Sequence, residues 1–189
     1  TADTVVIGAN AGGALTTGVN NTVVGFEALS TATELDKNTA IGYRALKVMS
    51  GSAGTGNNTA VGYQAGTAIT TGTQNTLVGS AAGDAITTGA ANVAIGKGAG
   101  TAITEGDTNV TVGYNAGELL STGDHNVLIG ANAGKGFDAE SYNTVVGKDA
   151  FKENGAAAKV TVLGYQALGG TTTGDADGTI AIGYQAGLA

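Results

Sequence analysis

Aliphatic residues and glycines alternate with polar residues in a unit that repeats along the whole chain. In each of eleven copies an aliphatic residue directly precedes a glycine, and a Val, Thr or Ile lies two positions before that aliphatic residue. The anchor glycines are Gly8, Gly25, Gly42, Gly62, Gly79, Gly96, Gly113, Gly130, Gly147, Gly164 and Gly183. Eight of their ten intervals are 17 residues, and the others are 20 and 19. A fixed short period indicates a solenoid, whose units bury their apolar faces only against one another.

The repeating unit favours β-structure over helix. Two β-branched or aliphatic side chains spaced by two residues share one face of a strand, which we expect to be the inner face. The third residue after every anchor glycine is alanine, typical of a cramped inward position. A looser apolar run such as Ala68-Ile69 follows, so two short strands and two turns are expected per coil. A helix is disfavoured, because each of the 34 glycines would cost about 1 kcal/mol in a helix interior. The prediction is one all-β domain over 1–189, a parallel β-solenoid of about eleven 17-residue coils.

Asparagine recurs four residues before the anchor glycine in eight coils. Stacked one coil apart, side-chain amides can hydrogen-bond along the rod as an asparagine ladder. A structural role therefore explains this column without a ligand. Its members are Asn21, Asn38, Asn58, Asn75, Asn92, Asn109, Asn126 and Asn143.

Composition and charge exclude several function classes. The net charge of -7 argues against a nucleic-acid partner. No stretch of 18 apolar residues occurs, so no membrane-inserted helix is expected. Cysteine is absent, and the one histidine, His125, has no second His or Cys to share a metal or activate a nucleophile. We therefore expect no enzyme, with no catalytic or cofactor-binding residues.

Acidic residues in two turns are the candidate metal ligands. Asp107 and Asp124 occupy the same position in consecutive coils, and Asp175 and Asp177 lie in the enlarged turn between Gly164 and Gly183. Carboxylates about 4.8 Å apart either bind a divalent cation such as Ca²⁺ or stay apart through solvent screening. Solvated carboxylates and no cofactor are the favoured interpretation, and a structural calcium ion is the alternative.

Five of the six tyrosines share the position directly after the anchor glycine. They are Tyr43, Tyr63, Tyr114, Tyr165 and Tyr184, and Phe26 holds the same position in the second coil. An exposed aromatic strip could contact a cell-surface glycan or another receptor. Ring-on-ring packing between neighbouring coils at 26, 43 and 63 is the favoured alternative, since aromatics in register stabilise strands without a ligand.

The residue two before the anchor glycine is expected to point outward, because its two neighbours are assigned to the inner face. This column is apolar in ten of eleven coils, which exceeds the exposed apolar surface that monomers usually tolerate. It predicts parallel self-association of two or three chains. The predicted interface residues are Val6, Val23, Leu77, Leu128, Val145 and Val162.

The unit Asn-Thr-Ala-Val-Gly-Tyr-Gln-Ala at 58–65, with its recurring Val/Ile-Gly-x-x-Ala core, resembles the head repeats of YadA-like trimeric autotransporter adhesins. It is still more similar to the Asn-Thr-Ala-x-Gly-Tyr-x-Ala-Leu repeats of phage tail fibres and bacterial surface fibres. The resemblance extends from Val5 to Ala186. It implies a left-handed β-roll, a homotrimer, and attachment to a host or surface from an extracellular, cell-surface or virion location.

The expected function is a non-enzymatic segment of a longer trimeric fibre, either shaft or head. One alternative is an ice-binding solenoid, suggested by the pairs Thr16-Thr17, Thr70-Thr71 and Thr87-Thr88. These columns are interrupted by Glu34, Glu105 and Asp138, and ice binding needs a regular array. The other alternative is a purely structural filament subunit without a receptor.

Overall fold

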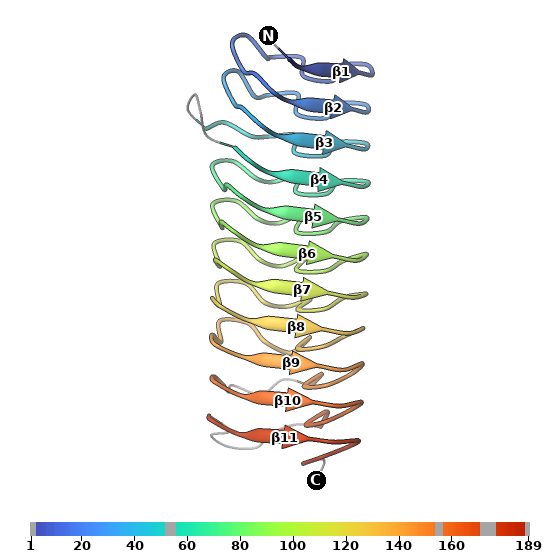
Figure 1. The fold of residues 1–189 in the computed structure, drawn as a ribbon, viewed down its shortest axis with the longest axis vertical. Helices are drawn as coiled ribbons and strands as arrows, with labels where there is room; N and C mark the ends of the chain where they lie inside the picture. The colour runs from blue at the N-terminus through green and yellow to red at the C-terminus, as the bar shows by residue number, and fades with distance from the viewer. Residues whose placement is uncertain (1–2, 52–55, 154–156, 171–176, 188–189) are drawn as a thin grey trace.

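A computed structural model describes residues 3–51, 56–153, 157–170 and 177–187. Eleven parallel strands stack in chain order as one sheet (Figure 1), which confirms the predicted all-β parallel solenoid. The strands are β1 (Val5–Ile7), β2 (Thr22–Val24), β3 (Thr39–Ile41), β4 (Thr59–Val61), β5 (Thr76–Val78), β6 (Val93–Ile95), β7 (Val110–Val112), β8 (Val127–Ile129), β9 (Thr144–Val146), β10 (Thr161–Leu163) and β11 (Ile180–Ile182). Within these ranges no helix has the length and hydropathy needed to cross a bilayer.

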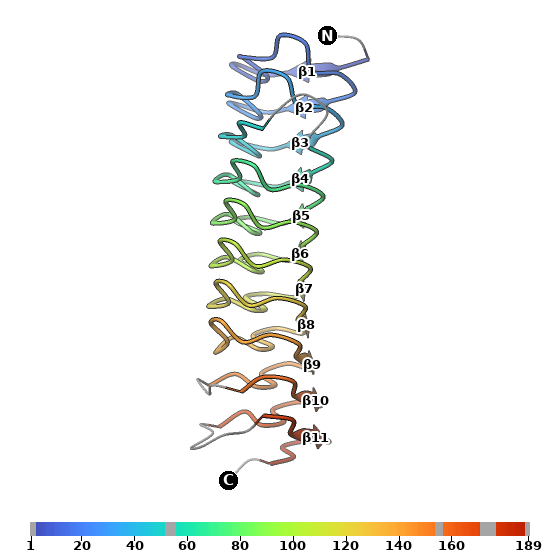
Figure 2. The ribbon, with the colours of Figure 1, turned by 90° about the vertical axis from the view of Figure 1, so that its left-hand side faces the viewer.

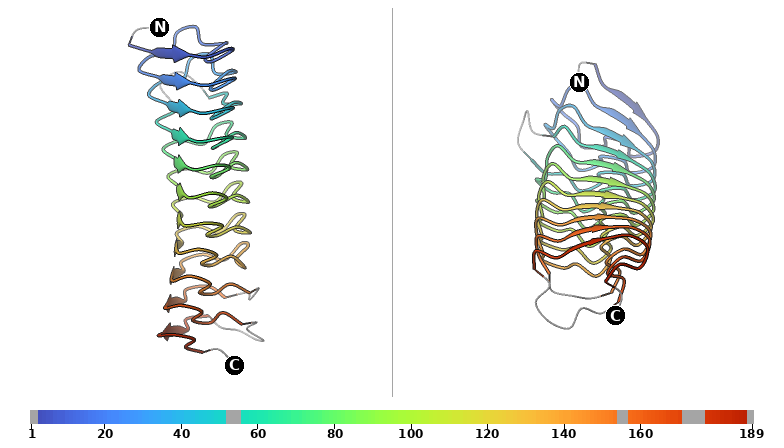
Figure 3. Two further views of the ribbon diagram at one scale, coloured as in Figure 1. Left: turned by 90° about the vertical axis from the view of Figure 1, so that its right-hand side faces the viewer. Right: turned by 60° about the horizontal axis from the view of Figure 1, so that its bottom comes forward.

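Each coil contains one three-residue strand in the described part of the chain, so the expected second strand is wrong. The sheet forms one wall of the rod, and turns form the rest (Figures 2 and 3). Left-handed backbone recurs at the second and fourth residues after the anchor glycine, as at Gln64 (φ 55°) and Gly66 (φ 58°). Such φ values are incompatible with an extended strand. The N–H of Ile69 then donates to the carbonyl of Gly66 at 3.2 Å, so the chain is still turning at the apolar run Ala68-Ile69.

The strands pair position for position, which stacks the anchor glycines directly on one another. Thr76 pairs with Val93, and Val78 pairs with Ile95. Gly79 has a φ of 140°, and a Cβ on it would lie 2.5 Å from the carbonyl oxygen of Gly96. Glycine is therefore required both for the backbone conformation and for the close approach of neighbouring coils.

The inward and outward faces of the strand are the reverse of those predicted. Val23, Leu77, Leu128, Val145 and Val162 are fully buried in the core of their own chain. Val6 is 46% exposed, because β1 has a neighbouring strand on one side only. Side chains enclosed within one chain cannot contact a second, so the predicted interface is wrong for these five residues, and for Val6 it stays a prediction.

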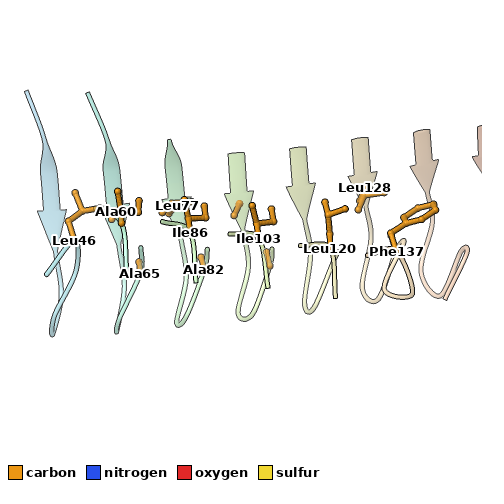
Figure 4. Packing of buried hydrophobic residues seen from close by; sticks show 14 of the residues in the cluster. Leu46, Ala60, Ala65, Leu77, Ala82, Ile86, Ile103, Leu120, Leu128 and Phe137 are labelled. Atoms are coloured by element: carbon orange, nitrogen blue, oxygen red, sulfur yellow. The ribbon is translucent and has the colours of Figure 1, made fainter. Parts of the chain in front are cut away.

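The core lies between the inner face of the sheet and the turn segments (Figure 4). Ile69, Ile86 and Leu120 reach it from the turns and are fully buried, as are most of the alanines three residues after the anchor glycines, such as Ala65 and Ala82. Phe137 and Phe151 stack in adjacent coils with ring centroids 4.4 Å apart. The predicted inward alanine column is confirmed.

The asparagine ladder is present, and its members are buried. The side-chain oxygen of Asn58 accepts from the backbone N–H of Asn75 at 2.9 Å, and the side-chain nitrogen of Asn58 donates to the carbonyl of Gly72 at 3.0 Å. Each rung from Asn21 to Asn126 satisfies one backbone donor and one backbone acceptor in this way. Where Val160 replaces asparagine in the next coil, its N–H still donates to Asn143 at 3.1 Å.

Candidate functional site

The outer face of the sheet carries the residues one and three positions before each anchor glycine. Every residue one before is aliphatic, and every residue three before is Val, Thr or Ile. Val78, Ile95 and Ile129 are 37–39% exposed. We call these two columns the outer face. One column is Val5, Thr22, Thr39, Thr59, Thr76, Val93, Val110, Val127, Thr144, Thr161 and Ile180, and the other is Ile7, Val24, Ile41, Val61, Val78, Ile95, Val112, Ile129, Val146, Leu163 and Ile182.

The outer face is large and uncharged. Eleven strands at about 4.8 Å spacing and three residues of about 3.3 Å each give roughly 500 Å². Soluble monomers seldom expose a contiguous apolar patch beyond a few hundred Å². No residue of either column is charged. This arrangement suits a dry contact with another surface.

The sequence already contained a signal for this orientation. Asn75 and Leu77 are two residues apart, so they share a strand face. Asn75 belongs to the asparagine ladder, whose amides bond to backbone groups in the interior of the rod. Both side chains are fully buried. Thr76 and Val78 must then point outward.

The predicted aromatic column forms stacks separated by gaps. Phe26 stacks on Tyr43 with centroids 5.5 Å apart, and Tyr43 stacks on Tyr63 at 5.2 Å. Tyr165 stacks on Tyr184 at 5.7 Å. The predicted packing at 26, 43 and 63 is confirmed. Tyr114 has no ring partner within the described ranges.

Charged side chains surround the first stack. The guanidinium of Arg44 lies 4.9 Å from the centroid of the Tyr43 ring. Glu27 pairs with Arg44 at 2.8 Å and with Lys47 at 2.9 Å. Hydrogen bonds from Lys47 and Arg44 lower the pKa of the Glu27 carboxyl. This edge of the first stack is thus already occupied by internal ion pairs.

The candidate metal ligands hydrogen-bond to backbone groups of preceding coils. Asp107 accepts from the N–H of Ala90, Asp124 from the N–H of Asp107, and Asp177 from the N–H of Ala158, each at 2.7 Å. Asp175 lies outside the described residues. Among those that are described, no group of three His, Cys, Asp or Glu side chains could hold a metal ion. These three aspartates therefore accept hydrogen bonds from backbone N–H groups in the turns. Ser141 does the same, because its hydroxyl accepts from the N–H of Asp124 at 2.9 Å.

His125 lies on the same edge as these aspartates. Its Nδ1 is 2.5 Å from the Thr108 hydroxyl, and its ring stacks on Tyr142 with centroids 5.1 Å apart. Both contacts join residues of adjacent coils. His125 therefore contributes to the packing of three successive coils.

The threonine pairs proposed for ice binding are partly occupied within the rod. The hydroxyls of Thr16, Thr70 and Thr87 donate to backbone carbonyls of the next coil at 3.0–3.1 Å. The second residue of each pair, such as Thr71 or Thr88, is exposed, and its hydroxyl is not one of these donors. The pairs therefore do not form the two-column array that an ice surface needs.

A polar hollow of about 180 Å³ lies near β10 and β11, lined in part by Asp149, Gln166 and Gln185. Its volume is below the roughly 300–1,000 Å³ of typical small-molecule sites. Gln185 donates to Gln166 at 3.0 Å, and Asn132 donates to Asp149 at 2.8 Å. These four polar side chains are thus paired within the rod, and the small volume of the hollow argues against a small-molecule site.

No protein-family model, curated protein or solved structure matches this chain.

Proposed function

We propose that this chain is a non-enzymatic segment of a self-assembling fibre that attaches to a host or surface. The observation that carries the proposal is the outer face, an uncharged strip of one aliphatic column beside a column of Val, Thr and Ile, which runs through all eleven coils. Parallel association of identical rods covers this strip in every coil at once. Two such faces would bury about 1,000 Å² in total, the lower limit for a specific interface.

The assembly we propose is a homotrimer with the outer faces turned toward a common axis. Symmetry and burial alone allow two or three chains. The resemblance to trimeric adhesins and tail fibres favours three, and with it an extracellular, cell-surface or virion location. Interface contacts then come from Val78, Ile95 and Ile129 and their equivalents, in place of the buried column around Leu77.

Sedimentation velocity tests the assembly with two double variants. Val78→Lys/Ile129→Lys puts charge into the outer face, and burial of an unpaired charge is costly. Thr71→Lys/Thr88→Lys puts the same charge at exposed positions elsewhere on the coil. We expect trimers for the unaltered chain and for the control, and monomers or aggregates for the first variant. A folded monomer at micromolar concentration for the unaltered chain would contradict the proposal.

Ice binding through the outer face is the second candidate. The observation that favours it is a block of outward threonines in consecutive strands, Thr22, Thr39, Thr59 and Thr76, paired in register. Each shares its strand face with a Val or Ile, so the block is a regular two-column array about 4.8 Å apart along the rod. Assembly and ice binding compete for this one surface. Thermal hysteresis is the measurement that tests ice binding. If the chain is monomeric and shows hysteresis that Thr39→Lys abolishes, ice binding is the function and the fibre proposal is wrong.

A further inference from the structure

The gap in the aromatic column between Tyr63 and Tyr114 deepens the proposed attachment function. The two rings belong to the fourth and seventh coils, three strand spacings apart, or about 14 Å. Between them the column holds only Ser80 and Lys97. Tyr63 and Tyr114 are 54% and 53% exposed.

The stacking geometry leaves one ring face of Tyr63 uncovered at this gap. Tyr43 and Tyr63 are nearly parallel, with 7° between their planes and 5.2 Å between their centroids, close to one strand spacing. Faces in this column are therefore turned toward the neighbouring coils. Tyr63 has Tyr43 on one side and the small Ser80 on the other, so one of its faces has no ring against it. Such faces suit the apolar C–H surface of a sugar ring.

Polar groups without protein partners lie in the same gap. The side chain of Asn115 extends over Gly98, where an added Cβ would collide with its Oδ1. In the described part of the chain, neither the Asn115 amide nor the Lys97 amine makes a side-chain hydrogen bond or an ion pair, in contrast to Lys135, which pairs with Glu118. Hydroxyl and carboxylate groups of a ligand would satisfy both.

The charge around the gap selects an acidic ligand. From the fourth to the seventh coil, the two positions after the anchor glycine are Tyr63-Gln64, Ser80-Ala81, Lys97-Gly98 and Tyr114-Asn115. None of these is a carboxylate, although the chain as a whole carries a net charge of -7. Lys97 is thus an unneutralised cation, exposed between two aromatic rings.

We propose that Tyr63, Lys97, Tyr114 and Asn115 form a binding site for an acidic saccharide. One sugar ring packs on each tyrosine, Lys97 pairs with a carboxylate, and Asn115 hydrogen-bonds to hydroxyls. Contacts of about 4 Å at each ring fit within the 14 Å gap. The site rests on the proposed attachment function, for which it is the receptor contact.

Titration of the full chain with trigalacturonate, followed by isothermal calorimetry or saturation-transfer NMR, tests the site. Maltotriose is the neutral probe. We expect trigalacturonate to bind, maltotriose to bind at least tenfold more weakly, and added salt to reduce the difference. Tyr63→Ala, Tyr114→Ala and Lys97→Gln should each weaken trigalacturonate binding at least fivefold. Tyr142→Ala, an equally exposed tyrosine away from the column, should leave it unchanged.

The outcomes separate this site from the assembly. No trigalacturonate binding, equal binding of both probes, or unchanged binding by the Tyr63, Tyr114 and Lys97 variants would overturn the site and leave the fibre standing. Binding by a chain that stays monomeric would support the site and contradict the trimer. Circular dichroism of each variant verifies that the fold is retained.

Discussion

The side-chain oxygen of Asn75 accepts a hydrogen bond from the backbone N–H of Asn92, 2.9 Å away in the next coil. The side-chain nitrogen of Asn75 donates at the same distance to the carbonyl of Gly89. One side chain thus holds two backbone groups that the turns leave without a strand partner. Since every ladder member is buried, water cannot replace these bonds.

Removing one rung should therefore destabilise the rod. Asn75→Ala leaves a buried N–H and a buried carbonyl unsatisfied, which should cost about 3 kcal/mol. Chemical denaturation followed by circular dichroism measures the loss. Asn20→Gly is the control, because Asn20 is an exposed asparagine with a φ of 59° that glycine also adopts. Equal stability of the two variants would show that the ladder contributes nothing.

Two anchor glycines separate the cost of backbone strain from the cost of a steric clash between neighbouring coils. Gly79→Ala combines an unfavourable φ with a Cβ 2.5 Å from the carbonyl oxygen of Gly96, whereas Gly183→Ala has a similar φ of 126° and no contact closer than 3.9 Å. We expect Gly183→Ala to cost about 1–2 kcal/mol from backbone strain. Gly79→Ala should cost more, because two backbones must move apart. Thermal melting of both variants checks the order, and a reversed order would refute the close-approach explanation.

Ionisation of the Asp84 carboxyl should lower the free energy of unfolding as the pH rises. Burial raises the pKa of its carboxyl above the ordinary value, so the unfolded chain releases this proton at lower pH than the folded chain does. The contribution of Asp84 is then fully present below its unfolded pKa and is lost as the pH rises through its folded pKa. Asp84→Asn should raise the melting temperature at pH 7 relative to the unaltered chain, and the difference should shrink toward pH 3. A difference independent of pH would contradict this assignment.

The sequence predicted the solenoid and the ladder because both follow from the repeat period. Asn75 recurs at equivalent positions, and stacking one coil on the next needs no further information. The face of Leu77 was predicted wrongly because the most uniformly aliphatic column was assigned to the core. Alanine at the equivalent positions Ala40, Ala60 and Ala94 is the better guide, since a 17-residue coil encloses little volume.

The candidate sites show a second limit of the sequence pattern. The stack of Tyr43 on Tyr63 follows from strand register alone. The approach of Asn115 to Gly98 depends on left-handed backbone at both residues, which the repeat does not specify. The bond from Ala90 to Asp107 likewise requires the folded turn, so the pattern could not distinguish a backbone acceptor from a calcium ligand.

The outer face is tested most directly by disulfide formation between chains. The sequence contains no cysteine, so any disulfide in a single-cysteine variant joins two chains. Ile95→Cys places the thiol in the outer face, and Thr88→Cys places it at an exposed position on a turn. A disulfide needs Cα atoms within about 7 Å, which equivalent residues around a shared axis can meet. Mild oxidation at micromolar concentration should give a covalent dimer for Ile95→Cys and none for Thr88→Cys. Equal cross-linking of the two variants, or cross-linking of Thr88→Cys alone, would contradict assembly through the outer face.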